Sequence, residues 1–144
     1  MGTGASAANY ARVEVNRLVQ ELNQQAQAKA RRGVNELRNA AILVLSKDGT
    51  GRRYKRGKSG WHIASAPGQP PAPDTGNLRR NWRQLVLAEF NGQGAGIRIR
   101  MRIKSDMPYS TFLEKGTRKM APRPYKQRIR DKAEPAIRAI YSSW

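Results

Sequence analysis

A fold that mixes helices with an antiparallel β-hairpin is predicted by three features of this sequence. The N-terminal third is rich in helix-forming residues with apolar side chains at helical spacing, the middle contains a strictly alternating strand, and the C-terminal segment is amphipathic. A length of 144 residues suits one ordinary domain. We therefore expect a single α+β domain over residues 1–144, with peripheral segments that find partners only in an assembly.

The first expected element is a long helix from about Asn9 to Ser46, a stretch that contains no proline and one glycine, Gly33. At 1.5 Å per residue it would be about 55 Å long, so one end should project beyond the domain. Its C-terminal half is expected to pack along the sheet, whereas the Ala- and Gln-rich N-terminal half should be frayed or bound to a partner. The apolar residues, spaced mostly by three, four or eight, are Tyr10, Val15, Leu18, Leu22, Ala26, Val34, Leu37, Ala41, Val44 and Leu45.

Residues 47–76 are expected to form an extended, basic and proline-rich arm, because they show no periodicity and such long loops are usually functional or disordered. The basic half cannot bury enough apolar area to fold alone, and the proline half should be extended and stiff. Trp61 is expected to occupy a pocket of its own chain or of a neighbour. The arm residues with which we expect neighbouring subunits to make contact are Arg52, Arg53, Tyr54, Lys55, Arg56, Trp61, Pro67, Pro70 and Pro71.

Two strands are expected next, over Trp82–Phe90 and Ile97–Ile103, joined by a glycine-rich connection over residues 91–96. In the second strand apolar residues alternate with Arg98, Arg100, Arg102 and Lys104, which is typical of a strand with one buried face. These cations would project at intervals of roughly 6–7 Å.

The row of four cations has three interpretations that the sequence leaves open. It could follow the phosphates of nonspecifically bound DNA. It could instead be solvated or paired with Glu89 across the hairpin, or it could meet an acidic face of another subunit. Sequence-specific recognition of bases is not expected, because no helix-turn-helix, zinc finger or aromatic stacking platform accompanies the row.

Short helical elements complete the expected fold. Asp74 or Thr75 is placed to cap a short helix over Asn77–Arg80. A second short helix is expected over Pro108–Lys115, ended by Gly116, with Tyr109, Phe112 and Leu113 turned inward.

The final helix is expected to begin at Pro124, because proline suits the first helical position. Pro135 lies inside the pattern and should kink or break this helix. The expected inner face consists of Tyr125, Ile129, Ala133, Ile137 and Ile140.

Composition argues for binding rather than chemistry. The net charge is +18, which attracts polyanions or acidic protein surfaces. There is no cysteine, one histidine (His62) and ten scattered acidic residues, so we predict no enzyme activity, no metal and no cofactor. No apolar run approaches the ~18 residues of a membrane span and residues 1–8 do not read as a signal peptide. We expect a soluble protein made in the cytoplasm, with no membrane partner.

Two ordered motifs suggest a family. Residues 67–79 read Pro-Gly-x-Pro-Pro followed by Asp-Thr-Gly-x-Leu-Arg, and residues 109–125 read Tyr-x-x-Phe-x-Glu-x-Gly-Thr followed by x-Pro-Arg-Pro-Tyr. With the long first helix, their order and spacing resemble the tail-completion (neck) family of long-tailed bacteriophages of the siphovirus type. The basic insert over residues 51–60 has no counterpart in that pattern. The matching residues are Asp74, Thr75, Gly76, Leu78, Tyr109, Phe112, Glu114, Gly116, Thr117 and Pro124.

The resemblance implies an α+β fold with a curved antiparallel sheet flanked by helices. It also implies a structural virion protein, assembled in the host cytoplasm, that joins the DNA-filled head to the tail as a ring of six copies and leaves a channel for DNA. Its partners would be copies of itself, head-closure (adaptor) and portal-side proteins, the tail terminator or tail tube, and genomic DNA through nonspecific contact. Alternatives are a free-standing, nonspecific nucleic-acid-binding protein and a tail terminator or other minor tail protein.

Residue roles follow from the same resemblance. Gly68 and the prolines would form a stiff arm lying on a neighbour, and the residues capping the short helix would sit behind it. Tyr109, Phe112 and Leu113 would pack under the sheet. Glu114 would form an internal ion pair or accept from backbone amides near Gly116 and Thr117. For each motif residue, maintenance of the fold and direct contact with a partner remain alternatives.

Overall fold

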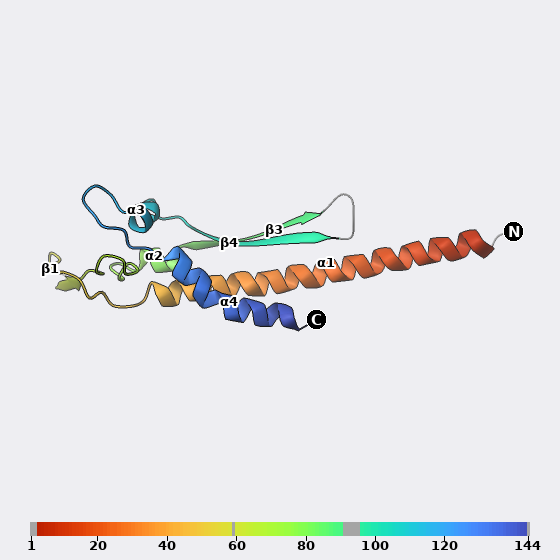
Figure 1. Cartoon of the computed structure of the whole chain (residues 1–144), viewed down its shortest axis with the longest axis horizontal. Coiled ribbons are helices and arrows are strands. Elements are labelled where there is room, and N and C mark those ends of the chain that lie inside the picture. The colour runs from red at the N-terminus through yellow and green to blue at the C-terminus, as the bar shows by residue number, and fades with distance from the viewer. Residues whose placement is uncertain (1–2, 59, 91–95, 144) are drawn as a thin grey trace.

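A 42-residue helix, α1 (Thr3–Val44), is the axis along which the other elements are arranged (Figure 1). The computed structural model describes residues 3–58, 60–90 and 96–143. The fold is α+β, as predicted, but its strands form two separate two-stranded antiparallel sheets rather than one. The remaining elements are β1 (Arg53–Lys55), β2 (Trp61–Ile63), α2 (Asn77–Arg80), β3 (Trp82–Phe90), β4 (Ile97–Ser105), α3 (Ser110–Lys115) and α4 (Lys126–Ser142).

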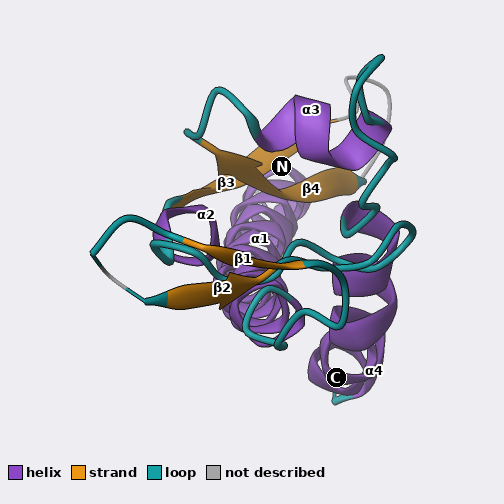
Figure 2. Cartoon of the chain, turned by 90° about the vertical axis from the view of Figure 1, so that its left-hand side faces the viewer, coloured by secondary structure: helices purple, strands orange, loops and turns teal. Residues whose placement is uncertain are grey.

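The two halves of α1 have different surroundings, as predicted. From Ala26 onward one face is buried against β3, β4 and α4, whereas the N-terminal half projects beyond them (Figures 1 and 2). Gly33 lies in a close approach between the helix and the sheet, since a Cβ there would be 2.5 Å from Met101 Sδ. That close approach explains a glycine that costs about 1 kcal/mol in helix propensity relative to alanine.

The β3–β4 hairpin covers one side of the buried half of α1. Its nine cross-strand pairs run from Trp82↔Ser105 to Phe90↔Ile97, which confirms the predicted hairpin. The predicted connection over residues 91–96 lies almost entirely outside the described residues. Ile99, Met101 and Ile103 are half-buried and alternate with exposed cations, as the sequence pattern indicates.

The core lies between α1, α4 and the base of this hairpin, and Tyr125 is at its centre. The Tyr125 side chain is fully buried, packs edge-on against Trp82 with ring centroids 6.3 Å apart, and donates its hydroxyl to the Ser110 carbonyl at 2.9 Å. Burial, with the nearby Glu114 carboxylate, raises the pKa of the Tyr125 phenol to about 12. The predicted inner face of the last helix is confirmed, since Ile129, Ala133 and Ile140 are buried and Ile137 packs against the same core.

The predicted start of the last helix is wrong, and of the kink or break predicted at Pro135 the break does not occur. The helix begins at Lys126 rather than Pro124, because the Glu114 carboxylate accepts from the backbone amides of Tyr125 at 2.9 Å and Lys126 at 3.2 Å. These bonds satisfy amides that a helix start leaves free. They also replace the contact near Gly116 and Thr117 expected for Glu114. The helix continues through Pro135 without a break.

The inward packing predicted for α3 is also mostly wrong. Leu113 packs against the core, but Tyr109 and Phe112 are 40% and 58% exposed. The cause is the position of α3 beyond the base of the hairpin, where no sheet lies over it (Figure 1). Gly116 ends the helix with a φ of 76°, as predicted, and a Cβ there would be 2.8 Å from the Met120 carbonyl oxygen.

Candidate functional site

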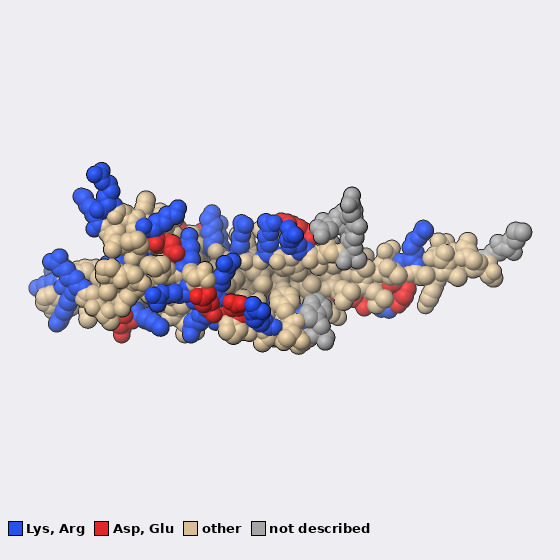
Figure 3. Space-filling view, in the orientation of Figure 1, with Lys and Arg blue, Asp and Glu red and all other residues tan. Residues whose placement is uncertain are grey.

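The surface of the β3–β4 hairpin that faces away from α1 carries five cations. The strand register adds Arg83, opposite Lys104, to the four cations predicted from the sequence. Two leucines lie among them, Leu85 opposite Arg102 and Leu87 opposite Arg100, each 41% exposed. Figure 3 shows the cations along the upper side of the molecule. We call this surface the basic face. It is made by Arg83, Leu85, Leu87, Glu89, Arg98, Arg100, Arg102 and Lys104.

Acidic side chains neutralise only part of the basic face. Glu89 pairs with Arg100 across the hairpin at 3.4 Å, and Asp106 pairs with Arg83 at 2.7 Å. Both pairs are well exposed, and such pairs contribute about 1 kcal/mol or less, so a partner's anions could replace them. Within the described parts of the chain, Arg98, Arg102 and Lys104 form no ion pair. The face therefore retains unneutralised positive charge.

The arm folds back onto its own domain, and the prediction that its basic half lacks secondary structure is wrong. β1 and β2 pair antiparallel, with Tyr54 opposite His62 and in edge-on ring contact at 5.1 Å. Arg56 forms an ion pair with Asp74. Backbone bonds across the hairpin, such as the Gly51 amide to the Ala64 carbonyl at 2.7 Å, add to this long-range pair and the ring contact, and local periodicity reveals none of them.

The proline half of the arm has no helix or strand, as predicted, and is attached to the domain at three points. The Gly68 amide donates to the Pro122 carbonyl at 3.0 Å, and Arg128 donates to the Gly68 carbonyl at 3.1 Å. Arg123 donates to the Ser65 hydroxyl at 2.8 Å. Burial increases along the proline residues of the predicted site, from exposed Pro67 through half-buried Pro70 to buried Pro71.

Trp61 occupies no pocket of its own chain. Its side chain is 61% exposed, and the Arg53 guanidinium lies over the ring at 4.5 Å from the centroid. A cation over an exposed indole is worth about 0.5–1 kcal/mol. The other part of the prediction, a pocket on a neighbour, remains a prediction. Arg52 and Lys55 are exposed beside it.

The capping prediction for α2 is half right. The Thr75 hydroxyl accepts from the Asn77 amide at 3.3 Å, whereas Asp74 is engaged by Arg56 and lies 3.8 Å from His62. Gly76 occupies the N-cap position with a φ of 78°, a left-handed conformation that favours glycine. Asp74 thus stabilises the arm through its ion pair and does not cap α2.

A pocket of about 580 Å³ between the arm, α2 and α3 was not predicted from the sequence. It is formed by segments far apart in the chain, so no local pattern could indicate it. Mostly apolar groups line it, with Asp74, Arg79 and Arg123 adding charge, and it could receive an apolar side chain of a partner. Its apolar and aromatic lining includes Leu45, Tyr54, Pro71, Leu78, Tyr109 and Met120.

The close packing of Gly49 against the opposite segment of the arm hairpin gives a testable prediction. A Cβ at Gly49 would lie 2.3 Å from the Ala64 carbonyl oxygen, which cannot move without shifting the backbone. Overpacking of this kind costs about 1–3 kcal/mol. Gly49→Ala should therefore speed hydrogen exchange of the Gly51 amide, which donates to the Ala64 carbonyl, and of the Ala64 amide, which donates to the Arg52 carbonyl, at least about fivefold. Gly4→Ala, where a Cβ meets nothing within 4 Å, is the control. Unchanged exchange in Gly49→Ala would contradict this packing.

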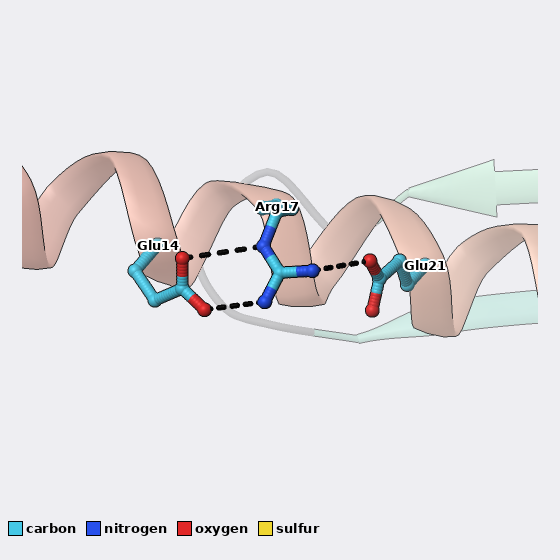
Figure 4. Close-up of polar contacts among 3 residues, drawn as sticks. All are labelled: Glu14, Arg17 and Glu21. Carbon is cyan, nitrogen blue, oxygen red and sulfur yellow. Dashed lines mark hydrogen bonds and ion pairs between the residues drawn. The ribbon is translucent and has the colours of Figure 1, made fainter.

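The N-terminal half of α1 exposes an apolar stripe. Val15, Leu18 and Leu22 are 57%, 46% and 53% exposed, and with Ala11 they recur at intervals of four, three and four residues. Arg17, one of two arginines in this half, pairs with both of its glutamates: it bonds to Glu14 at 3.2 Å and to Glu21 at 2.7 Å (Figure 4). We call Ala11, Val15, Leu18 and Leu22 the α1 stripe.

No three His, Asp or Glu side chains lie together as metal ligands in the described parts of the chain. None of its described helices is long and apolar enough to cross a membrane. Comparisons of the chain with models of known protein families, with curated proteins and with solved structures find no match.

Proposed function

We propose that this chain is a structural, non-enzymatic protein of a bacteriophage neck. Copies of it, six by the family resemblance, would form a ring between the head-closure and portal-side proteins and the tail terminator or tail tube. The ring would leave a channel for DNA, and the protein would act by binding alone, without a cofactor.

The observation that carries the proposal is the projecting half of α1. A domain of this size that leaves an apolar stripe uncovered along half of its longest helix is suited to completion by neighbours. The ordered motifs over residues 67–79 and 109–125 add the family resemblance. The basic face gives the subunit a surface for DNA in the channel or for an acidic neighbour.

The motif residues divide into two groups by burial. Leu78 is in the core, Glu114 caps α4, and Gly116 permits a close backbone approach, so these three support the fold. Tyr109 and Phe112 are exposed and are available for contact with another subunit. We therefore expect contacts between subunits at Tyr109 and Phe112.

Deletion of the gene from the phage that carries it tests this function. We expect filled heads and finished tails to accumulate unjoined in electron micrographs of lysates, with restoration when the intact gene is supplied on a plasmid. A gene lacking residues 51–60 tests whether the basic insert is needed for joining. Normal virions from the full deletion would refute the neck assignment. Tails of irregular length would instead indicate a tail terminator.

A free-standing, nonspecific nucleic-acid-binding protein is the second candidate. The basic face favours it, because Arg98, Arg102 and Lys104 lack acidic partners among the described residues. It would bind duplex DNA at submicromolar concentration, with a steep salt dependence. Tight DNA binding by a protein that never associates with heads or tails would favour this candidate over the neck.

A further inference from the structure

The α1 stripe continues an apolar face that is already buried elsewhere in the same helix. At 100° per residue, the four residues of the stripe lie on the same side of α1 as Ala26, Ala30 and Gly33, which are covered by the domain. The C-terminus of α4 lies near Lys29, whose ammonium donates to the Ser143 carbonyl at 2.8 Å, and no described residue of α1 before Ala26 is buried. Among the described residues, the stripe is thus an apolar continuation of the buried face that stays exposed.

Charge identifies the cover that suits this face. Residues 3–28 contain two arginines and two glutamates and have no net charge, so the whole +18 of the chain resides outside them. Two copies repel wherever their basic surfaces approach each other. The neutral half of α1 is a long exposed segment where copies can meet without that repulsion, because the charge of the Glu14–Arg17–Glu21 cluster, two carboxylates and one guanidinium, is offset by Arg12.

We propose that the N-terminal half of α1 is a self-association surface, occupied by the same segment of other copies of this chain. The four-three-four spacing of the stripe is the spacing at which helices interlock side chains along a seam. This names the contact between copies in the proposed ring and so rests on that function for its biological setting. The contact itself is a property of the purified chain.

Sedimentation velocity of the full-length protein over a range of concentrations tests this contact. Four seam positions make a small interface, so association should be weak and concentration-dependent rather than permanent. Salt should strengthen it, because higher ionic strength screens the repulsion between basic domains and leaves apolar contacts intact. We expect the association constant to rise at least about tenfold between 50 mM and 500 mM salt.

The variant Leu18→Gln/Leu22→Gln removes the centre of the stripe while keeping good helix formers. Loss of two partly buried leucines should weaken association at least about tenfold. The control is Tyr10→Gln/Val13→Gln, which changes two more exposed apolar residues of the same half-helix that lie off the stripe, and it should associate like the wild type. Leu18→Ala/Leu22→Ala repeats the test if circular dichroism finds helix lost in the first variant.

Three results would overturn the inference: a monomer at every concentration in 500 mM salt, equal association of the stripe variant and its control, or association that weakens with salt. Any of these results would refute the proposed contact between copies. The neck assignment would then still be tested separately, by the gene deletion. Conversely, normal virions from the deletion would remove the neck assignment while association of the purified chain could persist.

Discussion

Replacing Tyr125 by alanine should lower the free energy of unfolding by about 4 kcal/mol, the largest effect on stability expected for any single change here. The side chain is fully buried between α4, α3 and Trp82, so its removal leaves a cavity that surrounding helices can fill only in part. It also removes the hydrogen bond that the phenol hydroxyl donates to the Ser110 carbonyl. Urea unfolding followed by circular dichroism measures the loss.

Two further variants separate the contribution of the Tyr125 ring from that of its hydroxyl. Tyr125→Phe keeps the ring and loses only the hydrogen bond, so it should cost about 1 kcal/mol. Tyr10→Ala, at a position 74% exposed on α1, should cost nothing measurable. A loss below about 1 kcal/mol for Tyr125→Ala would mean that the packing of α4 on α1 does not depend on this residue.

Elements with a strong local pattern were predictable from the sequence. α1, the β3–β4 hairpin and the inner face of α4 follow from periodicities of 3.6 and 2 residues, which reflect burial of one face. The start of α4 was not predictable in this way, because it is set by Glu114, eleven residues before Tyr125. The β1–β2 hairpin was missed because its three-residue strands are almost wholly exposed and are fastened through Asp74.

Only the part of the basic face that belongs to β4 was predicted from the sequence. The four cations of β4 alternate with apolar residues, whereas β3 has apolar residues on both faces, so nothing in its pattern marks Arg83, Leu85 and Leu87 as members of the same surface. Only the register shows that they belong together. The same limit applies to the pocket, whose lining comes from distant segments.

The largest effect on binding is expected at the basic face. Arg98→Gln/Arg102→Gln/Lys104→Gln removes the three cations that lack acidic partners among the described residues. Each lost phosphate contact costs roughly a factor of eight near 0.1 M salt and reduces the slope of log K against log salt by about 0.9. If the face contacts DNA, the triple variant should bind duplex DNA at least about 100-fold more weakly, with a slope shallower by about 2–3. Fluorescence anisotropy over a salt series measures both.

The control for the basic face is Lys126→Gln/Arg130→Gln/Lys132→Gln, which removes three exposed cations from α4, a helix that lies beside α1 and outside the hairpin (Figure 2). Both triple variants have the same net charge, so an equal loss of DNA affinity would show that binding depends on total charge and not on this face. Unchanged DNA binding by the basic-face variant, combined with failure to join heads and tails in a complementation assay, would assign the face to an acidic subunit. The salt dependence separates the two surfaces of the molecule, because screening weakens a contact made by the cations and strengthens one made by the neutral half of α1.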